Sequence, residues 1–423
     1  MKYKQRQAQN QRILNITTNH LVVGIDIAQE THVARAVNYR GIELGKYLSF
    51  SNDGKGFEQL LRWVRSIQAQ HSLDNIIIGM EPTGHYWLNL AYWLVEKKIE
   101  TVVVNPYSVK QNKENRDNSQ TKNDIKDALV IADMIKNGYY APVRLATGVH
   151  KSLRVIMTSR GFVLKHLLSV KNQIVRWIDI YFPEYRNVFK DVTCQTSLSI
   201  LRLYPLPNDI KKVTSEQIRQ GLKKIAKRTV GQKRAQFIIE QARISVGDRE
   251  ALEEAKLYLN QLLDQYEQLS AQLNELEKKA LTLLEEIPYA KQMQAIKGIG
   301  TVTVAGILAE GGDLSQYRHG NQILRHGGLH LCEDSSGKHK GQIVVSKRGR
   351  PQLRKLLYMA VLSLTSNNNE FKQLHRHNVQ TKKMKKVHSI LKLCGKLARI
   401  LVGIAQRNEA YRPEKVLPLS LAA

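Results

Sequence analysis

The stretch "LVVGIDIA" at residues 21–28 decides the fold class. It is apolar, rich in β-branched residues and almost unbroken by polar ones, so it predicts a strand buried on both faces of a sheet. Asp26 stands in the middle of this strand. A carboxylate there is costly unless it lies at the functional edge of the sheet or binds a cation. The stretch therefore predicts a buried sheet and a candidate site together.

The flanking sequence extends this strand into an α/β domain over residues 21–145. "THVARAVNY" turns at "NYRG" and returns as "IELGKYLSF", which predicts a hairpin beside the first strand. Apolar runs at 75–80 and 101–106 predict two more core strands, each preceded by a helix. A polar loop at 107–120 then leads to a helix at about 122–137. This order is that of the ribonuclease H-like fold, a mixed sheet with helices on its faces.

The rest of the chain is predicted to be mainly helical. Residues 1–20 are polar and basic and are expected to form a tail. Residues 150–287 form a helical region with a coiled-coil seam, because apolar residues from 252 to 287 alternate by three and four over five heptads. The seam could pair with the helix at 152–180 or with a second chain; we favour self-association. Residues 288–423 are predicted to be a mainly helical C-terminal domain.

Charge points to a polyanionic partner. The formal net charge is +28, and residues 338–423 carry 19 Lys and Arg against 3 Asp and Glu. Such a surplus favours nucleic acid or an anionic membrane. No apolar run approaches the ~18 residues of a spanning helix, and no secretory signal is evident. The three widely spaced cysteines, Cys194, Cys332 and Cys394, match no zinc template and suit a reducing cytoplasm.

Four carboxylates carry the first candidate site. Glu81 follows a predicted strand directly, at the end that faces the ligand crevice in open α/β sheets. Asp124 and Asp127 are three apart on a predicted helix and so share one face. With Asp26 they could hold two Mg²⁺ ions, which prefer oxygen ligands. Two ions about 4 Å apart clamp the attacking and leaving oxygens of a phosphodiester.

Each acid also has a purely structural interpretation. Thr121 and Asp124 have the spacing of a capping box, and an acid is favourable in a first helical turn. Asp127 could belong to a solvated face, Asp26 could cap a turn, and Glu81 could be a loop acid. The occurrence of all four in ribonuclease H-like order favours the metal site.

Two later motifs suggest phosphate contacts. "KGIGTVT" at 297–303 is typical of a helix-hairpin-helix, whose glycines let backbone N–H groups face a DNA phosphate; an ordinary helix–turn–helix connection is the alternative. "EDSSGKHKG" at 333–341 pairs Ser335 with Ser336 without a Ser-His-Asp signature, so by itself it predicts a polar loop. Nearby cations could stabilise charge on a phosphate. The predicted nucleic-acid contacts are Lys297, Gly298, Gly300, Lys338, Lys340, Lys347, Arg348, Arg350 and Arg354.

These motifs resemble one family over nearly the whole chain, the DEDD-type insertion-sequence transposases, understood as bridge-RNA-guided recombinases. "VGIDIAQE", "MEPTGHYW" and "TKNDIKDA" resemble the three blocks of the family's RuvC-like N-terminal domain. "KGIGTVTVAGILAEGGD", "LRHGGL", "SSG" and "SKRGRPQLRKLLYMA" resemble its C-terminal transposase domain, in the same order. The chain departs from the family at Asn123, at Lys297 and in "GLHL", none of which is a proposed catalytic group.

The resemblance implies a recombinase that moves its own insertion sequence. It implies Asp26, Glu81, Asp124 and Asp127 as the Mg²⁺ tetrad and Ser336 as the nucleophile, with Ser335 as the competitor. The serine would form a covalent phosphoserine link to a cleaved strand. A noncoding bridge RNA would pair with donor and target DNA. The protein would be a homo-oligomer, a dimer or tetramer with composite active sites, in a bacterial or archaeal cytoplasm and associated with the nucleoid.

Two other functions fit the same residues. The first is a metal-dependent nuclease or Holliday-junction resolvase that has no serine nucleophile. The second is a non-enzymatic nucleic-acid-binding protein whose acids are caps and loop residues. Substitution of Ser336 tests the first, and substitution of the acids tests the second.

Overall fold

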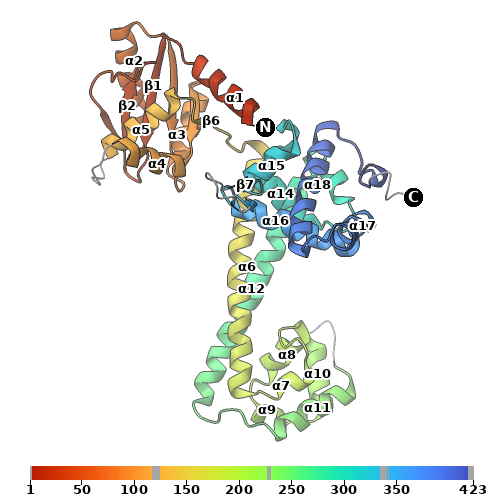
Figure 1. The fold of residues 1–423 in the computed structure, drawn as a ribbon. Helices are drawn as coiled ribbons and strands as arrows, with labels where there is room; N and C mark the ends of the chain where they lie inside the picture. Colours follow the sequence, from red (N-terminus) through yellow and green to blue (C-terminus); the bar gives the residue numbers. More distant parts are fainter. Residues whose placement is uncertain (1, 117–123, 226–229, 334–340, 342, 418–423) are drawn as a thin grey trace. The chain divides into compact units, whose positions relative to one another are not determined.

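The computed structural model describes residues 2–116, 124–225, 230–333, 341 and 343–417. The chain divides into two compact units, Met1–Leu145 and Ala146–Ala423 (Figure 1). The first is a mixed α/β unit, as the sequence predicts, and the second is mostly helical. Each unit is considered by itself below.

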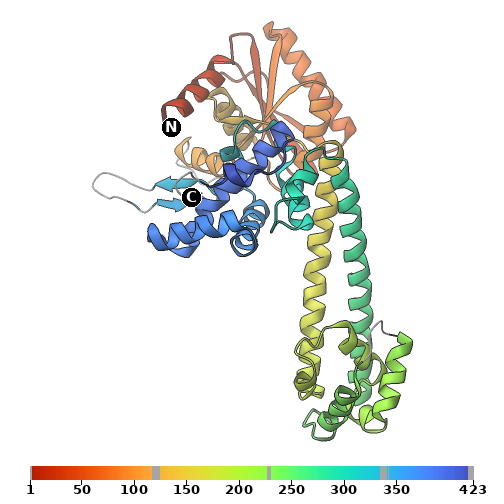
Figure 2. The ribbon, with the colours of Figure 1, turned by 90° about the vertical axis from the view of Figure 1, so that its right-hand side faces the viewer.

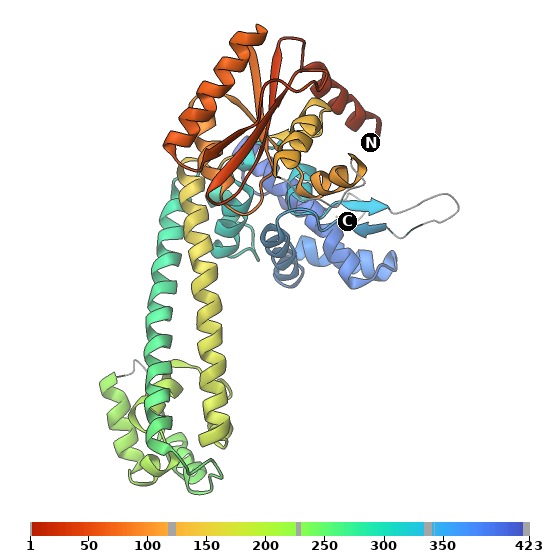
Figure 3. The same ribbon diagram turned by 90° about the vertical axis from the view of Figure 1, so that its left-hand side faces the viewer.

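A six-stranded mixed sheet forms the centre of the first unit (Figure 3), with the strand order β3-β2-β1-β4-β5-β6. β1 pairs with β2 antiparallel and with β4 parallel, and β5 continues the parallel part. The strands are β1 (His20–Asp26), β2 (Thr31–Val37), β3 (Leu48–Ser51), β4 (Asn75–Met80), β5 (Glu100–Val104) and β6 (Tyr140–Pro142). The apolar run that contains Asp26 therefore lies in the interior of the sheet, as predicted.

Helices cover both faces of this sheet. Leu21, Val23 and Ile25 of β1 are buried in a cluster with α2 and α3, whereas Val22 is buried in a second cluster with α5. Side chains alternate along a strand, so Gly24 and Asp26 share the α5 face with Val22. The helices are α2 (Gly54–His71), α3 (Trp87–Glu96), α4 (Pro106–Arg116) and α5 (Asp124–Lys136).

Two segments of the first unit are helical where the sequence suggests none. Lys2–Leu14 form helix α1 instead of a tail, and α4 occupies much of the predicted loop at 107–120. Gln9 and Arg12 of α1 donate hydrogen bonds to the carbonyls of Asn137 and Gly138. Neither helix has a clear apolar stripe. In α1, the hydrogen bonds to Asn137 and Gly138 supply stabilisation that a buried apolar face would otherwise provide.

Two long helices, α6 (Gly148–Tyr181) and α12 (Leu252–Glu285), organise the second unit. They lie side by side (Figures 2 and 3) and contact each other along their lengths. Within the chain the predicted seam therefore packs against α6, the first of the two alternatives, and self-association stays a prediction. Burial along the seam is uneven: Leu259 and Leu283 near the two ends are buried, whereas Leu273 and Leu276 are half-buried.

A small helical bundle connects the far ends of α6 and α12. Its core contains the fully buried rings of Trp177, Phe182 and Tyr185. Trp177 Nε1 donates to the carbonyl of Ala255 over 2.9 Å and so joins α6 to α12. The bundle helices are α7 (Tyr185–Val188), α8 (Gln195–Leu203), α9 (Pro207–Lys211), α10 (Ser215–Ile225) and α11 (Gln232–Arg243).

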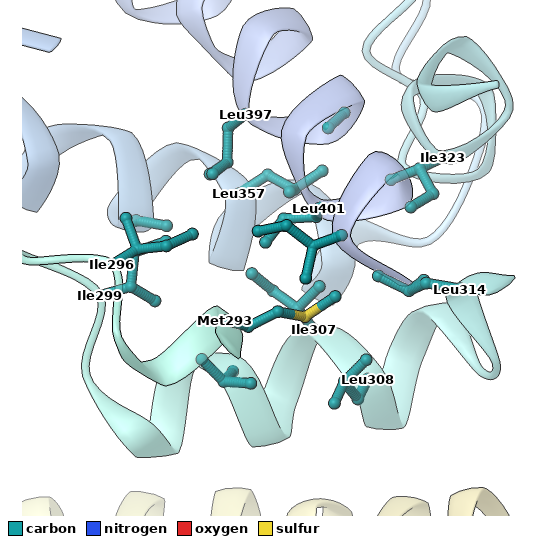
Figure 4. Close-up of a cluster of buried hydrophobic side chains, with 14 of the residues drawn as sticks. Met293, Ile296, Ile299, Ile307, Leu308, Leu314, Ile323, Leu357, Leu397 and Leu401 are labelled. Atoms are coloured by element: carbon teal, nitrogen blue, oxygen red, sulfur yellow. The ribbon is translucent and has the colours of Figure 1, made fainter. Parts of the chain in front are cut away.

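The C-terminal part of the second unit has a separate apolar core. Figure 4 shows Ile307, Leu357, Leu397 and Leu401 meeting there from three helices. No described helix is long and apolar enough to cross a membrane. The elements are α13 (Ala290–Gln294), α14 (Thr301–Gly311), η1 (Leu314–Gln316), α15 (Gly320–His326), β7 (Leu331–Glu333), β8 (Ile343–Val345), α16 (Pro351–Asn367), α17 (Asn369–Arg376), η2 (His377–Thr381), α18 (Lys386–Arg407) and η3 (Pro413–Lys415).

Candidate functional site

Asp26 and Glu81 occupy matching positions at one edge of the sheet. In the parallel pairing of β1 with β4, Ile25 is opposite Met80, so the next residue on each strand is an acid. Ile77 and Gly79 face α5, and the alternation continues to Glu81. Both acids are half-buried, and Glu81 Oε1 accepts a hydrogen bond from Thr83 over 3.2 Å. The sheet therefore directs two carboxylates toward the α5 side.

Helix α5 packs directly against the backbone of β1 at Gly24. A methyl group at Gly24 would lie 2.2 Å from the carbonyl oxygen of Ala128 and 2.3 Å from the backbone nitrogen of Ala132. Contact at Ala128 brings the first turn of α5 to the end of β1 that carries Asp26. That turn contains Asp124, which is exposed, and Asp127, which is half-buried.

The tetrad suits a divalent metal in its chemistry, because carboxylate oxygens are the ligands that Mg²⁺ prefers. Asp26 and Glu81 stand at matching positions of adjacent strands, and Asp124 and Asp127 stand in the first turn of α5. Within the described residues, however, no group of three or more His, Cys, Asp or Glu side chains is close enough together to hold a metal ion. The predicted convergence of the four acids on two Mg²⁺ ions therefore stays a proposal.

His32 and Asn52 support the loop after Asp26, and no sequence motif predicts this role for them. The fully buried ring of His32 accepts a hydrogen bond at Nδ1 from the N–H of Ala28 over 3.2 Å. Asn52 Nδ2 donates to the carbonyl of Gln29, and the Asn52 N–H donates to the carbonyl of Glu30. These bonds fix residues 28–30. A buried histidine on an alternating strand looks like any core residue in sequence.

Burial lowers the pKa of His32, and an interaction with the Asn52 side chain partly opposes that shift. His32 Nε2 and Asn52 Oδ1 are nevertheless both buried atoms without a hydrogen bond of good geometry among the described residues. The ring also meets Phe50 edge-on, with centroids 5.3 Å apart. His32 is thus a neutral, packed side chain that holds the backbone next to the candidate metal ligands.

The segment with the predicted nucleophile joins two paired strands. β7 and β8 are antiparallel, with Glu333 opposite Ile343. Ser336, its competitor Ser335, Lys338 and Lys340 belong to the connecting segment and lie outside the described residues. Leu331 and Ile343 on the strands are 68% and 66% exposed, so this hairpin presents apolar side chains to solvent.

The base of this hairpin is built from two glycine turns in contact. A methyl group at Gly349, where φ is +151°, would lie 2.5 Å from the backbone nitrogen of Gly328. Arg350 donates to the carbonyl of Glu310 over 2.6 Å, and Arg354 donates to that of Gly327 over 2.8 Å. Both predicted phosphate ligands are therefore partly engaged in holding the turns. Lys347 and Arg348 are exposed beside them.

Positive charge concentrates around these turns. Burial lowers the pKa of Arg350, and the nearby Arg154 lowers it further. Burial also lowers the pKa of His330, with additional contributions from Arg325 and Arg348. Such mutual repulsion among cations creates a local potential that favours a bound anion.

Only part of the backbone of the "KGIG" turn is exposed to solvent. Gly298 has φ +100°, and a methyl group there would lie 3.4 Å from Leu364 Cα of α16. Gly300 caps α14 at its N-terminus, and no atom lies within 4 Å of the corresponding methyl position. Lys297 and Gly300 are exposed. A phosphate would therefore approach at Gly300, because α16 covers Gly298.

Comparisons with known proteins give a consistent result. A transposase family model matches residues 23–183, and a model of the IS116/IS110/IS902 transposase family matches residues 290–376. The mini-circle transposase for IS117 of Streptomyces coelicolor is 25% identical over 74% of this chain and 77% of its own length. The pilin gene-inverting protein of Moraxella lacunata is 24% identical over 92% of this chain and 97% of its own. This chain belongs to the IS116/IS110/IS902 family of transposases.

Proposed function

We propose that this transposase rearranges DNA through a covalent link between Ser336 and a DNA strand, assisted by a divalent metal on Asp26, Glu81, Asp124 and Asp127. One observation carries the metal half of the proposal: Asp26 and Glu81 follow matching positions of two parallel strands, on the face that α5 covers. The strand order, with three antiparallel strands beside a parallel pair, supports a RuvC-like assignment for residues 21–145. The serine half rests on the family resemblance.

The proposed step is a phosphoryl transfer that conserves a bond. The Ser336 Oγ attacks the phosphorus, the bond from phosphorus to one bridging DNA oxygen breaks, and that oxygen leaves with the proton from the hydroxyl. Attack by a free strand hydroxyl on the phosphoserine reverses the step and rejoins DNA without ATP. A bound Mg²⁺ would stabilise negative charge on the phosphate oxygens during the transfer. Exposed Lys347 and Arg348 would bind the same strand electrostatically.

The partners in this proposal are donor and target DNA and a noncoding bridge RNA that pairs with both. Net charge +28 supports polyanionic partners. The pilin gene-inverting relatives are named for inversion, which supports strand exchange rather than simple cleavage. A homo-oligomer, dimer or tetramer, would join the tetrad of one protomer to the serine of another in the cytoplasm, on the nucleoid. The unit boundary near 145 separates the two sets of groups along the chain.

Single substitutions test the two halves separately. Ser336→Ala should abolish both recombination and the covalent protein–DNA adduct, whereas Ser335→Ala should keep them. Asp26→Asn should abolish both while leaving the protein folded by circular dichroism. If Ser336→Ala cleaves DNA at the wild-type rate, the enzyme is instead a metal-dependent nuclease or junction resolvase. If Asp26→Asn, Glu81→Gln and Asp124→Asn all recombine DNA normally, the tetrad proposal is wrong.

A further inference from the structure

A hollow lined by cations lies at the C-terminal end of α18 and the residues that follow it. Its volume is about 220 Å³. Five of its lining residues are basic and one is acidic: Lys396, Arg399, Arg407, Arg412, Lys415 and Glu409. Ile400 and Ile404 of α18 and Val416 form the apolar part of its lining. A concave site lined mainly by cations attracts an anion.

The helix presents these cations on one stripe. Lys396, Arg399, Gly403 and Arg407 are separated by three or four residues and so share a face of α18. Leu397 and Leu401 point the other way, into the apolar core (Figure 4). Packing on that core fixes the helix and thereby fixes the direction of the basic stripe.

Glycine makes room for one of the guanidinium groups. A methyl group at Gly403 would lie 2.8 Å from Arg407 Nη2, so the absence of a side chain lets Arg407 fold back over the helix. Glu409 contacts both Arg407, at 3.6 Å, and Arg412, at 3.4 Å. One carboxylate thus orients two guanidinium groups but cannot neutralise five cations.

The positive side chains that line the hollow also repel one another. Lys396 is half-buried, and burial, followed by the nearby Arg399, lowers its pKa. A bound anion would offset both the burial of the Lys396 charge and its repulsion by Arg399. Guanidinium groups suit phosphate oxygens because their planar N–H donors match them in pairs.

We propose that this hollow, lined by Lys396, Arg399, Arg407, Arg412 and Lys415, binds a backbone phosphate of duplex DNA. The cation-to-acid ratio fits a phosphodiester, and the apolar part of the lining fits the deoxyribose beside it. DNA is favoured over RNA because the chain belongs to a transposase family. The inference rests on the proposed function only in taking DNA as the partner; it requires neither the tetrad nor Ser336.

Fluorescence anisotropy of the full chain with a labelled DNA duplex, in EDTA, tests the proposal without any chemistry. Arg399→Gln with Arg407→Gln should weaken binding about tenfold and lower the salt slope of log Kd by about 1, for the one phosphate contact that is lost. The control, Lys212→Gln with Lys233→Gln, removes the same charge from exposed sites in the helical bundle and should change affinity much less. An equal loss in the control would overturn the proposal.

Two further variants, which should fold normally, show whether a loss of binding in the double variant comes from misfolding. Gly403→Ala should not lower the temperature of thermal unfolding, because only the flexible end of Arg407 must move and alanine favours the helix, yet it should weaken duplex binding. Glu409→Gln should strengthen binding by removing the competing carboxylate. A loss of affinity for single-stranded RNA but not for duplex DNA would assign the hollow to RNA and overturn the DNA proposal. Unchanged binding to duplex DNA in all the pocket variants would overturn it as well.

Discussion

Gly24 determines how closely α5 approaches the central strand. Because backbone atoms of Ala128 and Ala132 occupy the space of its missing side chain, Gly24→Val should force α5 outward. We expect a loss of about 1 to 3 kcal/mol in the free energy of unfolding, typical of overpacking. We also expect the recombination rate to fall further than this loss of stability alone would cause. Urea unfolding and a recombination assay measure the two effects.

Gly161 provides the matched control for this prediction. It lies within α6 with no atom near its methyl position, so Gly161→Ala should stabilise the protein by roughly 0.5 to 1 kcal/mol through helix propensity. Recombination should be retained. Equal behaviour of the two variants would show that the helix–strand approach at Gly24 does not matter.

His32 should make stability depend on pH in a defined direction. Its folded-state pKa lies below 6.5 because of burial, so between the two pKa values the unfolded chain binds a proton that the folded chain does not. The contribution of His32 to stability is therefore fully present above pH 6.5 and is lost as pH decreases toward its folded pKa. His32→Gln should lose this dependence, measured as the difference between variant and wild type in unfolding at several pH values. A constant difference across pH would contradict the assignment.

At the level of elements, Trp177 connects α6 to α12 inside the bundle core. Trp177→Phe keeps most of the ring but removes the indole donor, whereas the Ala255 carbonyl keeps the hydrogen bond of its own helix. We expect a loss of about 0.5 to 1.5 kcal/mol in the free energy of unfolding, the usual net contribution of one hydrogen bond. Hydrogen exchange should accelerate in the bundle but not in the six-stranded sheet. Val155→Ala, at a residue 62% exposed on α6, should change neither.

The elements that sequence predicted well are those with strong periodicity. The buried strand through Asp26, the strand ending at Met80 and the seam of α12 are examples. By contrast, α1, β6 and the β7–β8 hairpin are short or polar and depend on contacts distant in sequence. The acids could be proposed from the sequence because strand ends could be placed, whereas His32 was missed because burial of a polar ring leaves no periodic trace. The partner of α12 could not be read from its seam, which is equally apolar toward any helix.

For the whole molecule, charge should dominate nucleic-acid affinity. With a net charge of +28, binding to nonspecific duplex DNA should weaken at least about 10³-fold between about 50 and 200 mM salt, as expected for six or more phosphate contacts. Anisotropy titrations in EDTA measure this directly. A weak salt dependence would mean that base contacts or apolar contacts, including those of the exposed hairpin strands, dominate instead.

The two long helices, α6 and α12, also set the distance between the helical bundle and the C-terminal core. Each has 34 residues, so a continuous helix of that length spans about 51 Å at 1.5 Å per residue. On a DNA duplex this equals about 15 base-pair steps of 3.4 Å. If the bundle and the C-terminal core contact the same duplex, the helices act as a ruler: the two contacts must recur at a fixed spacing. Insertion or deletion of one heptad in both helices would then change the preferred spacing by about three base pairs.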